Sequence, residues 1–487
     1  MKIAFTTLGC KLNYAETSTY ERGFVAAGWE IVPWSAKADV YLVNTCAVTE
    51  TAEKKSRNFI RRAHKTNPEA RIVVTGCYAE LRREQIQAIE GVWRVFGANE
   101  KKQLVHVVLE GVLMSEPSAS PTPPTDSVSG PLPLTRPRVA MGSDTNTPSK
   151  TVSTVILSNS SPVILSNSSP VILSASEESS VIPSERSESS VSHSAETFGA
   201  YSTGERTRSF LKVQDGCNNF CAYCTVPFAR GRSRNIPICE CVKMAREIAA
   251  AGVKEVVLTG VNTGDFGRTT GESFLELLKA LNEVEDIERF RISSIEPNLI
   301  TPEIVDWIAS GTKFQPHFHI PLQSGSDTLL KRVGRRYDTA LFASRIDYIR
   351  RAMERPGGPK VFFGIDVIVG LPGETEDLFQ ETYAFLRDRI KPAFIHVFPY
   401  SRRPGTRAAE WKDQVKDSVK QERVAALEKL CEELHQEFAQ ANKGVREKVL
   451  WESSVKGGLM GGYTGNYIRL EKPFDPALVN TFEEVVL

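Results

Sequence analysis

The sequence predicts an α/β protein with an N-terminal parallel-sheet domain, a central partial barrel of six β/α units and a small C-terminal β domain. The first two domains are predicted by one pattern that occurs in two regions of the chain. Strand-like and helix-like segments alternate over residues 1–112 and again from about 205 to 400, which is typical of parallel sheets with crossover helices. For the third part, the tail after a charged amphipathic helix at 418–444 contains strand-like segments, which predict a small antiparallel sheet or barrel. The predicted domains are residues 1–112, 113–200, 201–445 and 446–487.

Composition excludes several classes of protein. Of the 487 residues, 41% are hydrophobic and 24% are charged, which is ordinary for a soluble protein. The start of the chain lacks the apolar core of a secretory signal, and no apolar run approaches the length of a membrane span. We therefore expect a cytoplasmic protein without a membrane partner. In that compartment, nine cysteines favour metal binding or catalysis over disulfides.

Three cysteines of the N-terminal domain occupy equivalent positions. Cys10, Cys46 and Cys77 each come directly after a predicted strand, in "LGCKLN", "NTCAVT" and "TGCYAE". The carboxyl ends of parallel strands meet at one edge of an open sheet, where ligands gather. We therefore predict that these residues, the sheet triad, converge and hold a metal cluster. Three unrelated buried cysteines would not explain the shared position.

The segment from 113 to about 200 differs in composition from both of its neighbours. It is rich in Pro, Ser and Thr, and "VILSNSSP" occurs twice in tandem. Phe198 is its only aromatic residue, so the segment can bury too little surface to offset the entropy of ordering. We interpret it as a disordered linker inserted between two domains.

A second group of three cysteines opens the central domain, in "DGCNNFCAYCTVPFARGRSR". A closed zinc site needs four ligands, and no second CxxC pair follows Cys217, Cys221 and Cys224 at the usual distance. Three thiolates on a short loop suit a [4Fe-4S] cluster with one iron left for a ligand that is not protein. Buried thiols without metal are the alternative, but the Asn, Gly and Arg residues of the loop predict exposure. We call these cysteines the loop triad.

The loop triad has the Cx3Cx2C spacing of the radical S-adenosylmethionine (SAM) enzymes, which it therefore resembles. In those enzymes SAM binds the free iron, and residues at the carboxyl ends of the barrel strands hold the rest of SAM. The predicted strands lie in "SFLKVQ", "EVVLTG", "RFRISS", "HFHIPL", "FFGIDVIVG" and "FIHVF". Glycines there let the backbone approach a ligand, and polar side chains share the same rim. The candidates for cofactor binding are Gly260, Asn262, Glu296, Gln323, Gly370 and Gly373.

Other histidines and cysteines receive no ligand role. The expectation for three histidines on these strands is that they are satisfied core or rim residues: His317, His319 and His396. Three further cysteines lack companions at a suitable spacing: Cys239, Cys241 and Cys431.

The whole layout resembles the methylthiotransferases, whose C-terminal module, TRAM, is a small RNA-binding β-barrel. "TLGCKLNYAE", "VNTCAVTETAEKKSR", "KVQDGCNNFCAYCTVPFARGRSR", "HFHIPLQSGSD" and "DVIVGLPGET" closely resemble the branch acting on threonylcarbamoyladenosine in tRNA. The resemblance covers nearly all of the chain outside 113 to about 200. Relatives acting on isopentenyladenosine in tRNA, or on a ribosomal protein, typically carry other residues after the first cysteine, so "GCKLN" favours the threonylcarbamoyl branch.

This resemblance implies a specific reaction. The loop triad would hold the [4Fe-4S] cluster that passes one electron to SAM, and the resulting 5′-deoxyadenosyl radical would remove hydrogen from carbon 2 of the adenine. The sheet triad would hold an auxiliary [4Fe-4S] cluster that carries the sulfur, methylated by another SAM. The product would be 2-methylthio-threonylcarbamoyladenosine at position 37 of tRNA. An electron donor of reductase or flavodoxin type and a sulfur donor are implied as partners.

Basic clusters agree with an RNA partner although the net charge is only +1. RNA loops are gripped by aromatic and arginine surfaces, with phosphate contacts from basic residues. The segments "RGRSR" (230–234), "RRPGTR" (402–407) and "GYTGNYIR" (462–469) offer such contacts, although solvated faces balanced by acids are an equal alternative for any single cluster.

Two rival functions remain open at this point. A two-cluster electron carrier or iron–sulfur RNA-binding protein would bind clusters without cleaving SAM. A zinc protein would lack visible absorbance, but each triad would then need another ligand to close its shell.

Overall fold

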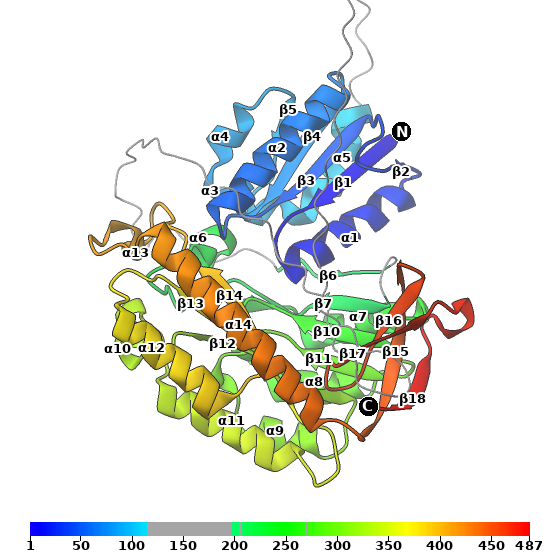
Figure 1. The fold of residues 1–487 in the computed structure, drawn as a ribbon. Coiled ribbons are helices and arrows are strands. Elements are labelled where there is room, and N and C mark those ends of the chain that lie inside the picture. Colours follow the sequence, from blue (N-terminus) through cyan, green and yellow to red (C-terminus); the bar gives the residue numbers. More distant parts are fainter. Residues whose placement is uncertain (114–196, 204–206, 269) are drawn as a thin grey trace, which may run out of the picture.

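The computed structural model describes residues 1–113, 197–203, 207–268 and 270–487. An N-terminal domain sits on a larger barrel, and a C-terminal sheet lies against the side of that barrel (Figure 1). The α/β fold class predicted from the sequence is confirmed. The division by residue number stays a prediction, and most of the proposed linker at 113–200 lies outside the described residues.

The N-terminal domain is built on a five-stranded parallel sheet in the order β2-β1-β3-β4-β5. Its strands are β1 (Lys2–Thr7), β2 (Glu30–Ile31), β3 (Val40–Thr45), β4 (Arg71–Gly76) and β5 (Val92–Val95). Its helices are α1 (Lys11–Ala26), α2 (Glu50–Thr66), α3 (Cys77–Leu81), α4 (Arg83–Gln87) and α5 (Leu104–Leu113), with a 3-10 turn at Ala98–Gln103. Every residue of the central strand "VYLVNT" is buried, because α1 and α5 cover one face of the sheet and α2 to α4 cover the other.

The central domain is a sheet of seven strands in the order β14-β13-β12-β11-β10-β7-β6. Its strands are β6 (Ala200–Tyr201), β7 (Arg208–Lys212), β10 (Glu255–Thr259), β11 (Arg289–Ile292), β12 (Phe314–Gln323), β13 (Phe362–Val369) and β14 (Phe394–Pro399). All but the short edge strand β6 are parallel to their neighbours. The six parallel strands follow one another in chain order, which is the partial barrel that the sequence predicted. A short antiparallel pair, β8 (Gln214–Asp215) and β9 (Arg234–Asn235), flanks the loop triad.

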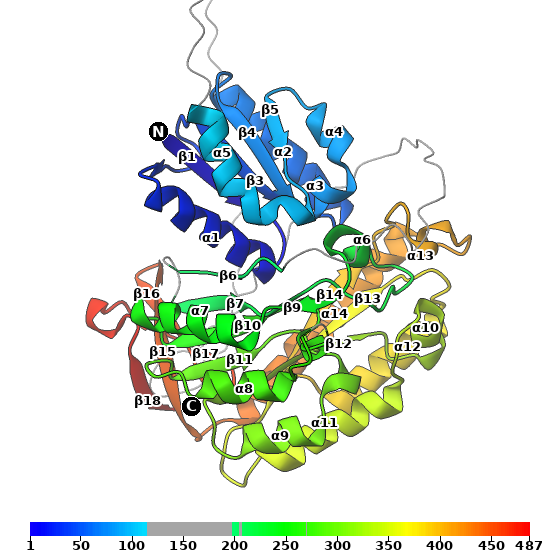
Figure 2. The ribbon, with the colours of Figure 1, turned by 180° about the vertical axis from the view of Figure 1, so that it is seen from behind.

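Helices surround the barrel (Figure 2). They are α6 (Val226–Arg230), α7 (Ile238–Ala250), α8 (Phe274–Asn282), α9 (Pro302–Ala309), α10 (Asp327–Val333), α11 (Thr339–Met353), α12 (Glu376–Ala384), α13 (Arg407–Glu410) and α14 (Asp417–Ala441), with 3-10 turns at Thr263–Asp265 and Pro297–Leu299 and a π turn at Phe385–Ile390. The long helix α14 packs against β14 at the open edge of the sheet. Among the described residues, no helix is both long enough and apolar enough to cross a bilayer.

The C-terminal domain is an antiparallel sheet in the order β17-β16-β15-β18. Its elements are β15 (Arg446–Lys456), β16 (Leu459–Tyr463), β17 (Arg469–Pro473), a 3-10 turn at Pro476–Leu478 and β18 (Phe482–Val486). Thr464 N donates to Ile468 O at 3.0 Å and Tyr467 has a φ of +67°, so a tight loop separates β16 from β17.

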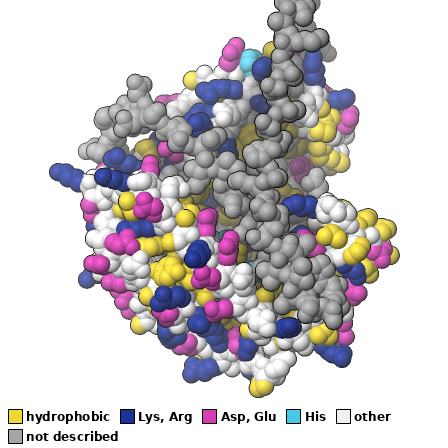
Figure 3. Space-filling model, in the orientation of Figure 1, with side chains coloured by type: hydrophobic (Ala, Val, Ile, Leu, Met, Phe, Trp, Pro, Cys, Tyr) yellow, Lys and Arg dark blue, Asp and Glu magenta, His cyan; other side chains and the backbone are white. Residues whose placement is uncertain are grey.

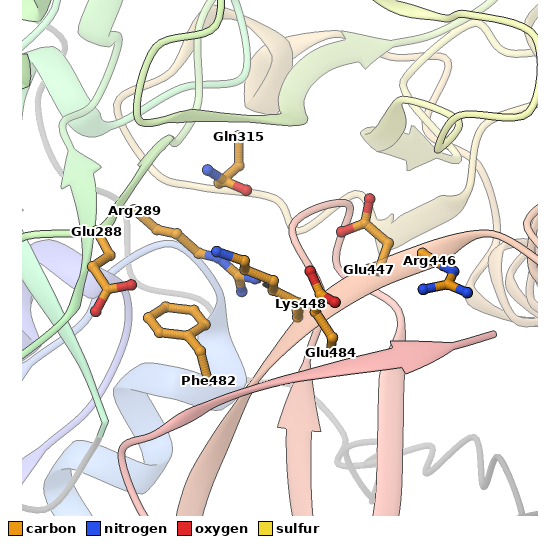
Figure 4. A pocket seen from close by; sticks show the side chains of 8 residues that line it. All are labelled: Glu288, Arg289, Gln315, Arg446, Glu447, Lys448, Phe482 and Glu484. Atoms are coloured by element: carbon orange, nitrogen blue, oxygen red, sulfur yellow. Dashed lines mark hydrogen bonds between the residues drawn. The ribbon is translucent and has the colours of Figure 1, made fainter.

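Arg289 of β11 attaches the C-terminal sheet to the barrel. Its guanidinium donates to the carbonyls of Tyr463 and Lys448 and lies 4.5 Å from the ring centre of Phe482. Figure 4 shows Arg289, Lys448 and Phe482 among the residues around a small cavity of about 300 Å³ between the sheet and the barrel. Because the arginine uses both carbonyls and an aromatic face, the sheet is held in one orientation on the barrel.

The described chain resumes at residue 197, and its first residues pack against the N-terminal domain and the barrel. Phe198 stacks on Tyr20 of α1 with ring centroids 5.5 Å apart, and the ammonium of Lys212 lies 5.7 Å from the Phe198 ring. Arg22 of α1 then donates to the carbonyl of Tyr201 in β6 at 2.9 Å. This segment therefore joins the N-terminal domain to the barrel.

We expect Phe198→Ala to lower the free energy of unfolding by about 2 kcal/mol, because the ring is partly buried between the two domains. Urea denaturation followed by circular dichroism measures this loss. The matched control is Phe474→Ala, whose side chain is 42% exposed, and which should change stability by no more than about 0.5 kcal/mol. Equal effects of the two substitutions would contradict the packing role of Phe198.

Candidate metal centres

The sheet triad follows three neighbouring strands. Cys10 caps α1 after β1, Cys46 follows β3, and Cys77 opens α3 after β4. Gly9, with a φ of +106°, lies so close that an added Cβ would be 3.1 Å from the Cys46 sulfur. Gly76, with a φ of +100°, lets β4 end against the Thr45 backbone, where a Cβ would clash at 2.3 Å. The structure thus brings the three thiols to one edge of the sheet.

Two asparagines fix the loops that carry these thiols. The side chain of Asn13 donates to the carbonyls of Leu8 (2.7 Å) and Thr45 (3.0 Å). Asn44 in turn donates to the carbonyl of Asn13 at 3.0 Å. Sequence reasoning missed both residues, although "GCKLN" and "NTC" placed each of them within three positions of a cysteine.

The chemistry of the sheet triad fits an iron–sulfur cluster. Burial raises the pKa of Cys46 to about 12, and the charges of Cys77 and Cys10 act in the same direction. Burial likewise raises the pKa of Cys77. Cys46 and Cys77 are therefore protonated at neutral pH until a metal replaces the protons, so metal affinity of the site should rise with pH. Three thiols that affect one another electrostatically match the donor set of a cluster with one open iron.

The loop triad lies between β8 and α6. The backbone N–H of Asn219 donates to the Cys217 sulfur, and the backbone N–H of Val226 donates to the Cys224 sulfur, both at 3.4 Å. The third sulfur, on Cys221, accepts a hydrogen bond of 3.3 Å from the guanidinium of Arg335. Donors of this kind stabilise thiolates, so the loop is prepared to hold ligands of a cluster.

Electrostatic effects also tie the loop triad together. Burial, reinforced by the charge of Cys221, raises the pKa of Cys217 to about 11 and that of Cys224 to about 12. The loop triad, like the sheet triad, therefore has the donor set for a cluster. The three remaining cysteines lie elsewhere, on α7 and α14: Cys239, Cys241 and Cys431.

Two of the six rim candidates lie against the loop triad. Glu296 is buried, and its carboxylate accepts hydrogen bonds from Asn219 (2.8 Å) and Arg335 (2.6 Å). The side chain of Asn262 accepts from the Glu296 backbone at 3.2 Å. Arg335 thus bridges Glu296 and the Cys221 sulfur, a role that the sequence did not indicate.

The other four candidates have mixed surroundings. A Cβ added to Gly260 would lie 2.9 Å from Gln214, which precedes the loop triad in the chain. Gln323 ends β12 with a φ of +71°. The space beside Gly370 is filled by Lys420 and the space beside Gly373 by Arg332, both from helices packed on the outside of the barrel. The two last glycines are therefore required for packing, and their role toward a cofactor stays a prediction.

A buried charged network joins the two triads. Glu16 of α1 accepts from Lys101 and Lys212 at 2.8 Å each and from Arg230 at 3.2 Å. Asp215 of β8 accepts from Lys212 at 2.7 Å and from Arg230 at 3.0 Å. Burial alone would raise the pKa values of Glu16 and Asp215, but the surrounding cations hold both well below their usual range. Both acids are therefore charged, and the network stabilises contact between the N-terminal domain and the barrel.

The basic clusters expected to face RNA are partly internal. Two of their arginines are buried on carboxylates: Arg230 on Glu16 and Arg403 on Glu53. On the face shown in Figure 3, the visible Lys and Arg side chains are mixed with Asp and Glu. These arginines therefore support the fold, and only exposed members such as Arg402 and Arg407 remain available to a phosphate.

A cavity of about 580 Å³ lies where the three parts of the chain meet. Cys10 and Lys11 line it from the N-terminal domain, and Tyr463 and Tyr467 line it from the C-terminal sheet. Strands β7 and β10 to β14 supply most of the remainder. The size suits one nucleoside-sized ligand, and the sheet triad reaches the cavity through Cys10.

The three barrel histidines line the same cavity, and one of them contacts a carboxylate. His319 Nε2 lies 2.7 Å from Asp366 Oδ1, and the rings of His319 and His396 stack at 4.9 Å. Burial lowers the pKa of His396 to about 4, so this ring is neutral. Against expectation, His317 is not satisfied: its Nδ1 has no hydrogen-bond partner among the described residues.

Comparisons with known proteins agree with this geometry. Residues 2–97 match the model of the uncharacterized protein family UPF0004, and residues 211–386 match the radical SAM superfamily. Among solved structures, the radical SAM methyltransferase TsrM from Kitasatospora setae, with cobalamin and a [4Fe-4S] cluster bound, aligns with a TM-score of 0.50. At 13% identity, covering 84% of this chain and 77% of that one, it supports the fold alone. The central domain is a radical SAM barrel.

Relatives of similar length narrow the family. Threonylcarbamoyladenosine tRNA methylthiotransferase MtaB of Bacillus subtilis (strain 168) is 36% identical over 96% of this chain and 89% of its own length. The MtaB protein of Aquifex aeolicus (strain VF5) is 32% identical over 97% of both chains. A tRNA-2-methylthio-N(6)-dimethylallyladenosine synthase of Geobacter sulfurreducens is 39% identical, but over only 57% of this chain. The chain belongs to the family of threonylcarbamoyladenosine tRNA methylthiotransferases.

We expect Glu16→Gln to lower the free energy of unfolding by about 3–5 kcal/mol at pH 7, because it leaves three buried cations without their shared acid. The pKa of Glu16 is lowered by folding, so its stabilisation is complete above about pH 4 and is lost as the pH falls further. The difference between wild type and variant should therefore shrink in acid.

Urea denaturation of both proteins between pH 3 and 8 measures this difference. Glu110→Gln removes an exposed glutamate that contacts only His106 in an i,i+4 pair, and it should change stability by no more than about 0.5 kcal/mol. A Glu16→Gln protein that is as stable as wild type at pH 7 would show that the network does not hold the domains together.

Proposed function

We propose that this protein replaces the hydrogen on carbon 2 of threonylcarbamoyladenosine at position 37 of tRNA with a methylthio group. The observation that carries the proposal is the pair of three-thiol groups connected through α6. Cys224 precedes this helix and Arg230, its last residue, contacts the loops of the sheet triad through Asn13. Similarity to the MtaB proteins over nearly the full length supports the choice of substrate.

Each triad is proposed to hold one [4Fe-4S] cluster. The sheet triad would hold the auxiliary cluster, and the loop triad would hold the cluster that binds SAM, with Asn262 and Glu296 the best placed of the six rim candidates. When bound, the clusters and SAM supply the electron transfer, the hydrogen abstraction and the methylthio group.

The residues of the chain contribute placement and the exclusion of water. Arg335 and Asn219 hold Glu296 against the loop triad, so a ligand there meets a fixed carboxylate. Lys212 and Arg230 hold the two triads at a constant separation by binding Glu16 and Asp215 together. The cavity beside Cys10 admits a nucleoside-sized group, and the aromatic side chains in its wall limit the space left for water.

Other partners belong to the same proposal. An electron donor of reductase or flavodoxin type and a separate sulfur donor are needed to complete the reaction. Because the proposed substrate is a tRNA, the proposed site of action is the cytoplasm.

The decisive experiment uses anaerobically reconstituted protein with SAM, a strong reductant and tRNA that carries threonylcarbamoyladenosine. The tRNA is digested and its nucleosides are weighed. A mass gain corresponding to one methylthio group in place of hydrogen supports the proposal. SAM cleavage without that product would refute the substrate, and the absence of any SAM cleavage would favour an iron–sulfur protein without catalysis.

Single cysteine substitutions should separate the two centres. We expect Cys221→Ala to abolish both SAM cleavage and methylthiolation, because it removes a ligand of the loop triad. Cys46→Ala should abolish methylthiolation while SAM cleavage remains. Each variant should retain roughly half of the wild-type iron after reconstitution.

Iron analysis, SAM cleavage and nucleoside mass are measured on the same samples. Cys239→Ala is the control, because this exposed cysteine lies at the start of α7 and should leave all three measurements unchanged. If Cys46→Ala retained full iron and activity, the sheet triad would not be a cluster site.

A further inference from the structure

Lys11 is a cation without an acidic partner in the wall of the central cavity. It is the first residue of α1, next to Cys10, and its ammonium lies 3.2 Å from the Ser293 hydroxyl. No carboxylate of the described residues lies within 4 Å of it. Two other cations of the same wall are paired, since Arg208 binds Glu452 at 2.9 Å and Arg291 binds Glu255 at 2.8 Å.

The acid whose charge acts on Lys11 is already engaged. Asp366 lies 2.7 Å from His319, and it affects Lys11 only through its longer-range charge. A partly buried ammonium that contacts one hydroxyl has lost water without gaining a counter-charge. A ligand anion at this point would supply that counter-charge.

His317 supplies a second unsatisfied polar group in the same wall. Its side chain is 7% exposed, and its Nδ1 has no hydrogen-bond partner among the described residues. The ring is fixed, because it stacks on Phe362 at 5.1 Å and contacts Tyr467 at 4.8 Å. The ring is therefore a rigid part of the cavity wall, and its buried Nδ1 is left without a protein partner.

Aromatic side chains complete the wall opposite the strands. Tyr463 and Tyr467 of the C-terminal sheet stack at 4.8 Å, and Phe362 lies 5.4 Å from Tyr467. Arg208 packs 4.6 Å above the Tyr463 ring. Planar bases bind to surfaces of this kind by stacking, so the cavity combines a place for a base with a cation that lacks an anion.

We propose that Lys11, with Ser293 and His317, forms the subsite that binds the threonine carboxylate of the modified adenosine. This inference rests on the proposed function. The threonylcarbamoyl group ends in a free carboxylate, which is the anion that Lys11 lacks. An isopentenyl group is apolar and would leave the ammonium unpaired, so the same contact would discriminate between the two modified adenosines.

The test compares two anticodon stem-loop RNAs that differ only in charge. One carries threonylcarbamoyladenosine, and in the other the threonine carboxylate is replaced by the neutral carboxamide. Fluorescence anisotropy of the reconstituted protein, without reductant so that no turnover occurs, gives both dissociation constants. We expect wild type to bind the carboxylate RNA about tenfold more tightly, as for a hydrogen bond to a charged group.

Variants assign the preference to the subsite. Lys11→Gln should bind both RNAs equally and with the affinity that wild type shows for the carboxamide RNA, and Ser293→Ala should reduce the preference in part. Lys279→Gln, which removes an exposed lysine on α8 outside the cavity, should keep the full preference. Iron content, measured on every sample, shows whether a substitution next to Cys10 has disturbed the sheet triad.

Equal binding of the two RNAs by wild type would overturn the proposal, even if Lys11→Gln could not be purified. A preference that survives in Lys11→Gln would also overturn it. Failure of the proposed function looks different: wild type would then methylthiolate an isopentenyladenosine RNA and leave the threonylcarbamoyladenosine RNA unchanged.

Discussion

The shared ion cluster around Glu16 and Asp215 is the constraint on which the rest of the molecule depends. Two acids and their cations are buried together, where each charge is stable only while its partners are present. The acids come from α1 and β8 and the cations come from both domains, so neither domain can satisfy the cluster alone. Docking of the N-terminal domain on the barrel is therefore an electrostatic requirement of folding, and the two thiol groups inherit their relative position from it.

Much of this organisation follows from the sequence because it is local or periodic. The positions of the sheet triad follow from parallel strands that end at one edge, and the six barrel strands are readable from their alternation with helices. The Glu16 contacts are of another kind, since Lys212 lies 196 positions away and Arg230 lies 214 positions away. Nothing in the local pattern of either segment indicates such a pair.

The predicted cofactor-binding residues at the barrel rim show what sequence motifs alone cannot determine. Glu296 and Asn262 do meet the loop triad, but the glycines at 370 and 373 are explained by the side chains of Lys420 and Arg332 that fill the space beside them. A glycine in a sequence shows that a side chain is not accommodated, and only the fold shows whether a ligand or another helix occupies the space. Basic segments were ambiguous for the same reason, because an arginine on a buried carboxylate and one awaiting a phosphate look alike in sequence.

The tight loop between β16 and β17 makes the C-terminal sheet part of the central cavity. It carries Tyr467 into the central cavity, opposite Lys11 from the first turn of α1. During synthesis the residues near position 11 leave the ribosome early and those near position 467 leave it late. The cavity is therefore complete only in a chain whose translation has reached the C-terminal sheet, because Tyr463, Tyr467 and Arg469 form part of its wall.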